Sequence, residues 1–134
     1  IAIVSALTIV RLIDIIEETK KNNNIDDLHL QNTLIRCVER KELESEKVKA
    51  EIRVIWGDYF KDVQLEAYPD THQIVHGIMM LSSKTKQTID RKVALELVDE
   101  VNKFASIFWS TKDVETEKVI SPYPPSIEII RPKL

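Results

Sequence analysis

The sequence predicts an all-α fold: a bundle of four or five helices followed by an extended proline-rich C-terminal arm. The chain has 134 residues, only two of which are glycine, and four of its five prolines fall within the last thirteen positions. Residues that form turns are therefore scarce before residue 120, which favours long helices over many short strands. A chain of this length can bury a substantial core without metals or disulfides. We expect one helical-bundle domain over residues 1–120 and an extended arm or linker over residues 121–134.

The opening segment predicts a helix from Ile3 to Lys21. Its polar residues recur every three or four positions and leave most of the circumference apolar: Ser5, Thr8, Arg11, Asp14 and Glu18. Such a helix is usually central in a core. Its apolar surface is nevertheless larger than one small bundle needs to cover, so we expect self-association through Ile9 and Ile13. Arg11 and Asp14 interrupt the apolar run well short of a transmembrane span.

Two apolar faces follow, separated by a charged interval. Asp26 or Asp27 can cap the next helix start. Leu34 and Ile52 are 18 residues apart, which is five helical turns, so one helix from Asp27 to Val63 can carry both faces. The alternative is a break near residues 41–45, with Ser45 as a new N-cap. Ten of the fifteen residues from 39 to 53 are charged, five of each sign, a balance that predicts a solvated helix face.

Two further helices are expected before the arm. Asp70 and Gln73 resemble a capping box, which predicts a helix from Thr71 to Leu81. Ser82 and Ser83 should separate it from a strongly amphipathic helix over residues 84–110. In the arm, proline removes backbone donors and fixes φ. The isoleucines that follow are too apolar for a free tail, so we expect the arm to pack across an apolar groove, with Tyr123, Ile127 and Ile129 as anchors and Arg131 at the rim.

Composition excludes several functional classes. The net charge of −3 removes the basic surface expected of a nucleic-acid-binding protein. With two isolated glycines, Gly57 and Gly77, the chain cannot form a phosphate-binding loop, a dinucleotide fingerprint or a G-x-S-x-G motif. Cys37 is the single cysteine, so no intramolecular disulfide forms. An unpaired cysteine fits a reducing compartment, and we expect a cytoplasmic protein.

The residues that could carry chemistry are few. His72 and His76 lie four residues apart in HQIVH and could share a metal ion, but Gln73 stands where a zinc peptidase needs its glutamate, so the pair is only a weak metal candidate. Cys37 lies between Ile35 and Val38, where a small buried residue is expected. Arg11 and Asp14 could form a buried ion pair, but we expect these charged residues at the surface. Six of the eight aromatic residues fall in two helical patches, around Trp56 and around Phe108, which favours core packing.

These observations predict a noncatalytic helical domain that acts by self-association or by binding another protein, with no cofactor and no catalytic residue assigned. Six residues are predicted to bind the partner: Ile9, Ile13, Tyr123, Ile127, Ile129 and Arg131. One alternative is a small metal-dependent or carboxylate-based hydrolase or nuclease in a helical bundle. A second alternative is a sensor or regulatory segment that adjoins a membrane anchor.

Overall fold

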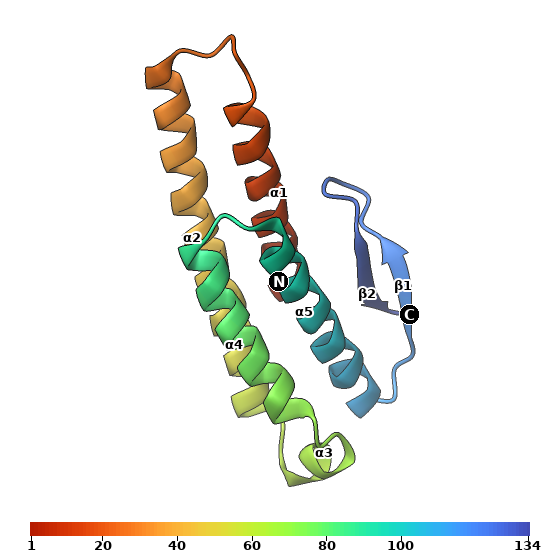
Figure 1. Ribbon diagram of the computed structural model, residues 1–134. Coiled ribbons are helices and arrows are strands. Elements are labelled where there is room, and N and C mark those ends of the chain that lie inside the picture. The colour runs from red at the N-terminus through yellow and green to blue at the C-terminus, as the bar shows by residue number, and fades with distance from the viewer.

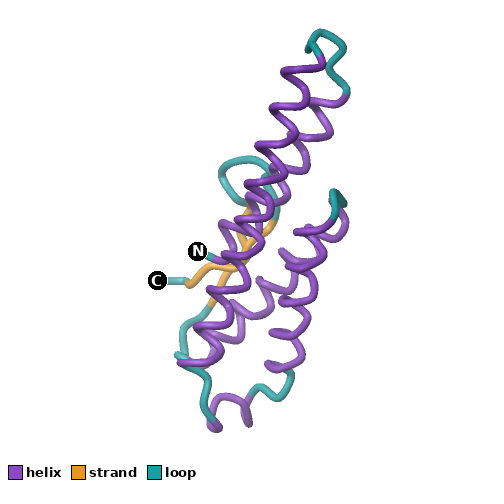
Figure 2. The backbone as a smooth tube through the Cα atoms, turned by 90° about the vertical axis from the view of Figure 1, so that its left-hand side faces the viewer, coloured by secondary structure: helices purple, strands orange, loops and turns teal.

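The computed structural model describes all 134 residues and has five helices and one small sheet (Figure 1). In chain order they are α1 (Ala2–Lys20), α2 (Asp27–Asp58), α3 (Asp62–Ala67), α4 (Thr71–Gln87), α5 (Arg91–Thr111), β1 (Thr116–Ile120) and β2 (Glu128–Pro132). The four long helices form a bundle in which α1 contacts α2 and α5, while α4 contacts α2 and α5. One end of the α1–α2 pair projects beyond the other two helices (Figures 1 and 2). The predicted helical bundle is confirmed, although the fold also contains two strands.

Helix α1 is the central helix of the core. It contributes six of the sixteen residues in the main apolar cluster: Ala2, Ala6, Leu7, Ile9, Val10 and Ile13. Ile9 and Ile13 are 0% and 1% exposed. Their packing against the neighbouring helices accounts for the wide apolar circumference of α1, and it leaves no surface for a partner at these two positions.

Helix α2 is a single unbroken helix of 32 residues. At its start, the side chain of Asp26 accepts a hydrogen bond from the backbone N–H of His29 at 2.9 Å. Ser45 does not begin a new helix, because its hydroxyl donates to the carbonyl of Lys41 within the same helix at 2.9 Å. The helix ends at Asp58, before the predicted Val63, and the short α3 follows.

The boundary between α4 and α5 was predicted in the wrong place. Helix α4 continues through Ser82 and Ser83 to Gln87. Ser82 is fully buried, and its carbonyl accepts a hydrogen bond from the Thr85 hydroxyl at 2.9 Å, so these small polar residues face inward within a helix. The break comes at residues 88–90, where the Asp90 side chain accepts from the backbone N–H of Lys92 at 3.0 Å. The capping box predicted at Asp70 is also absent, since its side chain makes no capping bond.

The extended C-terminal arm is not confirmed. Strands β1 and β2 instead pair as an antiparallel hairpin, with Val119 opposite Ile129. The hairpin begins at Thr116, before the predicted boundary at residue 121, and it lies beside one side of the bundle (Figure 1). It contacts α5, so the apolar residues of the segment are covered by pairing and packing within this chain.

Candidate functional site

Six buried polar residues gather inside the bundle, and we call them the polar layer. They come from α1, α2 and α4, and each is at most 4% exposed: Ser5, Lys41, Glu44, Ser45, Ser82 and Thr85. The prediction of a solvated face is therefore wrong for the three members on α2. Helix α2 lies between α1 and α4, so charged positions on the sides toward these two helices are removed from water.

Lys41 ties α2 to the C-terminal end of α4. Its ammonium nitrogen donates to the carbonyl oxygens of Thr85 at 2.5 Å and Lys86 at 2.8 Å. These carbonyls belong to the last turn of α4, where backbone acceptors lack helical partners and the helix dipole is negative. Beside them, the hydroxyls of Ser45 and Thr85 lie 2.9 Å apart. Burial lowers the pKa of Lys41, while the charge of nearby Glu42 opposes that shift.

Glu44 is the buried carboxylate of the layer. One of its oxygens lies 2.8 Å from a guanidinium nitrogen of Arg40 and 3.4 Å from the Lys47 ammonium. Burial raises the pKa of Glu44, but the hydrogen bond from Ser5 and the two cations outweigh it, so the net shift is downward. Glu44 is therefore ionised at neutral pH. The Ser82 hydroxyl oxygen is the one buried side-chain polar atom without a partner.

The residues that could ligate a metal do not converge. No group of three or more histidine, cysteine, aspartate and glutamate side chains is placed to hold one ion. The Nδ1 atom of His72 accepts a hydrogen bond from the indole N–H of Trp56 at 3.1 Å. His29 lies at the start of α2, with its Nδ1 atom 2.8 Å from an Asp26 carboxylate oxygen. The weak metal candidates His72 and His76 thus have no third ligand.

Cys37 lies in a hollow of about 490 Å³ between α1 and α2, whose lining includes Arg36 and Arg40. The residue is 8% exposed. Burial raises the pKa of its thiol, and the charge of Arg36 opposes this shift. The thiol is therefore protonated at neutral pH, whereas the thiolate is the form that attacks electrophiles and binds metals. The structure agrees with the expectation of a small buried residue.

The other candidate residues have structural partners. The ring of Tyr59 packs edge-on against Phe60 and Phe108, with centroids 5.4 and 5.2 Å apart, which is the core packing predicted for the aromatic patches. Asp14 does not pair with Arg11. Its carboxylate instead accepts from Arg91 on α5 at 2.8 Å.

The residues predicted to bind a partner occupy separate places. Ile9 and Ile13 lie in the core. Ile127 and Ile129 are half-buried and pack against that core, whereas Tyr123 is 44% exposed. Arg131 forms an ion pair across the hairpin, with its Nε atom 2.8 Å from Glu117. These residues do not form one continuous surface.

Comparison with known proteins identifies the family. Residues 1–112, which include every helix, match the nickel-containing superoxide dismutase family. The superoxide dismutases [Ni] of Streptomyces seoulensis and Streptomyces coelicolor are 36% and 34% identical over 87 residues, or 65% of this chain. The alignment covers 64% of the length of each relative.

Solved structures agree with this match. A nickel superoxide dismutase solved in its apo form gives a TM-score of 0.71 and 29% identity, covering 84% of this chain and 93% of that one. The native form gives a TM-score of 0.69 and 31% identity, covering 83% and 88%. The bundle thus has the fold of these helical metalloenzymes. The chain belongs to the nickel-containing superoxide dismutase family.

This assignment corrects the functional prediction. A noncatalytic interaction domain is wrong, because the family and the curated relatives are enzymes. The hydrolase or nuclease alternative fails for the same reason, since superoxide dismutases carry out a redox reaction. None of the helices combines the length and apolar character needed to cross a bilayer.

The polar layer was missed for a reason that the sequence contains. One face of α2 carries a stripe of five residues at helical spacing: Lys41, Glu44, Ser45, Val48 and Ile52. The three polar residues therefore lie on the same inward face as the apolar Val48 and Ile52. Extending that stripe through the charged interval would have found the layer. By contrast, the high local charge alone suggested a surface.

Proposed function

We propose that this chain is the helical body of a nickel superoxide dismutase. Such an enzyme converts two superoxide anions and two protons into one molecule of dioxygen and one of hydrogen peroxide. The proposal is carried by the family match over residues 1–112, which spans all four helices of the bundle. The chain covers 64% of the curated relatives' length, so the activity of the whole protein is part of the proposal.

The side chains described here do not fit a nickel site. Divalent transition metals need several convergent nitrogen, sulfur or oxygen donors, and no three such side chains converge in residues 1–134. Cys37 is held as a thiol by burial, and His72 already accepts the Trp56 hydrogen bond. We therefore derive no catalytic step from these side chains. The contribution that we propose for this chain is a rigid bundle, with α1 fixed in its centre by the apolar core and by Ser5 of the polar layer.

The test uses the protein purified from its own cells without chelators, with the same protein stripped of its metal as a matched control. Superoxide consumption is measured while metal content is determined on the same samples. We expect activity that scales with nickel content, and no activity of the stripped protein. A protein that carries nickel stoichiometrically and leaves superoxide untouched would contradict the proposal.

Self-association is retained as a proposal on a different surface from the one first predicted. Helix α2 exposes Leu28, Ile35 and Leu43, whose exposed fractions are 76%, 64% and 49%. Exposed apolar residues grouped in this way are typical of interaction surfaces. Sedimentation velocity of Ile35→Glu, with Ile120→Glu on the hairpin as control, tests this surface. Only the first substitution should dissociate an oligomer, and a monomeric starting protein would contradict the idea.

A cytoplasmic location is also retained as a proposal. It is supported by the single unpaired Cys37, since extracellular proteins more often pair their cysteines. Fractionation of the source cells tests it, and recovery of the protein in the extracellular fraction would contradict it.

A further inference from the structure

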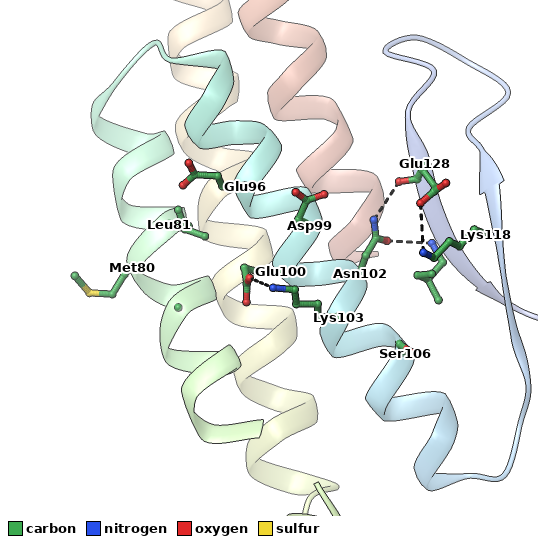
Figure 3. A pocket seen from close by; sticks show the side chains of 12 residues that line it. Met80, Leu81, Glu96, Asp99, Glu100, Asn102, Lys103, Ser106, Lys118 and Glu128 are labelled. Carbon is green, nitrogen blue, oxygen red and sulfur yellow. Dashed lines mark hydrogen bonds and ion pairs between the residues drawn. The ribbon is translucent and has the colours of Figure 1, made fainter. Parts of the chain in front are cut away.

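A groove of about 730 Å³ runs over the outer face of α5, between α4 and the C-terminal hairpin (Figure 3). Its floor carries Glu96, Asp99 and Glu100, which are spaced i, i+3 and i+4 on α5, and Met80 and Leu81 of α4 form one wall. The opposite wall comes from the hairpin, which includes Glu128 and Ile130. The family match ends at residue 112, so this wall is built from residues beyond it.

One side chain of α5 makes two hydrogen bonds to the hairpin. The amide of Asn102 donates to the carbonyl oxygen of Glu128 at 3.1 Å, and its oxygen accepts from the backbone N–H of Ile130 at 3.0 Å. Both bonds are drawn in Figure 3. Because Asn102 satisfies both a donor and an acceptor of β2, the strand is held at a defined distance from α5. The groove is therefore formed before any ligand arrives, which reduces the ordering that binding requires.

The charges of the groove are unbalanced. Glu100 pairs with Lys103 at 2.8 Å, and Glu128 lies 3.9 Å from the ammonium of Lys118. Glu96 and Asp99 have no cationic partner among the ion pairs of the structure, although both line the groove. Two unpaired carboxylates therefore remain in a concave surface that also contains the apolar side chains of Met80, Leu81 and Ile130.

The two carboxylates and the apolar side chains of the groove together limit the type of ligand that it can bind. A single metal ion does not fit, because no three of the carboxylates converge on one point. The superoxide anion is repelled by the uncompensated negative charge, so the groove is not the approach for the proposed substrate. A ligand that fits has separated positive charges joined by apolar stems. Lysine and arginine side chains combine both features, since their methylene stems lie on apolar surface while the charged ends reach acceptors.

We propose that the groove over α5 is a docking site for a lysine- or arginine-bearing extended segment of a partner protein. A second copy of this chain is not the proposed occupant, because the self-association proposed above uses the exposed apolar residues of α2, which are not part of the groove. The proposal is independent of nickel and of superoxide turnover, because none of the groove residues belongs to the polar layer or to the metal-donor candidates.

Fluorescence anisotropy with a short labelled peptide of alternating lysine and leucine tests the proposal on residues 1–134. A peptide of alternating glutamate and leucine is the control ligand. The double variant Glu96→Gln/Asp99→Asn removes the two free charges, and Glu17→Gln/Glu66→Gln removes two exposed charges elsewhere. We expect saturable binding of the basic peptide, weakened at least about fivefold by the first variant, as two charge pairs of about 0.5 kcal/mol each would give. The second variant should bind as the parent does.

The contribution of the hairpin is tested separately by Asn102→Ala, which removes both bonds to β2. Circular dichroism confirms that the helices persist, and binding of the basic peptide should weaken because the wall of the groove is released. Equal binding by parent and Glu96→Gln/Asp99→Asn, binding of the acidic peptide, or no saturable binding at low salt each overturns the proposal. Binding of the linear polyamine spermine that is as tight as binding of the peptide likewise overturns the assignment to a basic partner segment.

Discussion

The polar layer inside the bundle and the groove over α5 contain the same kinds of residue in different surroundings. In the layer, the side chain of Glu44 is 5% exposed and contacts Arg40 and Lys47. In the groove, Glu100 is 23% exposed and contacts Lys103, which is 61% exposed. Water reaches both charges of the second pair, whereas around Glu44 it reaches the two cations, whose side chains are 54% and 46% exposed, but hardly the carboxylate. Burial therefore decides whether such a pair holds the fold together or leaves charge available to a ligand.

This difference follows from what happens when one partner is removed. A buried group that loses its partner keeps the full penalty of having left water. An exposed group that loses its partner is simply hydrated again, so exposed pairs contribute little. Substitutions in the two regions should therefore differ in size, and each prediction below tests that difference.

The largest effect is expected for Lys41→Ala. The change removes two hydrogen bonds to the end of α4 and leaves a cavity where the side chain packed, so the free energy of unfolding should fall by about 3 kcal/mol. Urea unfolding measures it. Lys84→Ala, an exposed position on α4, is the control and should change little. Equal effects of the two substitutions would mean that Lys41 is not buried as described.

The same residue predicts a response to alkaline pH. Burial lowers the pKa of Lys41 below its ordinary value of 10.5, so the folded protein releases this proton before the unfolded chain does. Between the two pKa values the unfolded state binds more protons, and stability contributed by this group rises with pH. The parent should therefore gain stability relative to Lys41→Met as pH rises toward 10.5. A constant difference between the two proteins across that range would refute the assignment.

A smaller and opposite response is expected for Glu44→Gln. The pKa of Glu44 is lowered in the folded state, so its ionised form contributes stability above the ordinary value of 4.5. At neutral pH the variant should be less stable by about 1–2 kcal/mol. That deficit should shrink as pH falls below 4.5 and through the folded pKa. Urea unfolding at a series of pH values checks this, with Glu39→Gln on the exposed side of α2 as control.

The smallest change in stability is expected in the groove, for Lys103→Gln. Its ammonium is exposed and pairs only with Glu100, so the melting temperature should stay within the range of surface substitutions. The freed carboxylate of Glu100 should nevertheless strengthen binding of the lysine–leucine peptide. Weaker binding by this variant would show that Lys103 itself contributes to the docking site.

The apolar part of the fold could be predicted from periodicity. Helix α1 was expected at Ile3–Lys21 and lies at Ala2–Lys20, and the two faces of α2 proved to lie on one helix. These predictions succeed because apolar side chains at helical spacing lie on one face of a helix, and that face is stable only when it is buried. The junction at Ser82 failed because a serine that packs inward inside a helix looks like a loop residue in sequence.

Other features of the fold depend on contacts between residues that are far apart in the chain, and these could not be predicted from local sequence patterns. The pairing of Thr116–Ile120 with Glu128–Pro132 gives the proline-rich segment a structure that its composition alone does not specify. Burial of Lys41 depends on the end of α4, 44 residues away. The family was not visible in any short motif either, because the three histidines and the cysteine are dispersed rather than gathered in a recognisable pattern.

That dispersal leads to the central claim, which is that the chain belongs to the nickel-containing superoxide dismutase family while its side chains do not converge on a nickel site. Calorimetric titration of nickel(II) into residues 1–134 at neutral pH tests it most directly, with His72→Ala and Cys37→Ser as matched variants. The account predicts only weak binding, with no tight one-to-one step and no change on Cys37→Ser. Tight one-to-one binding that either substitution abolishes would contradict it.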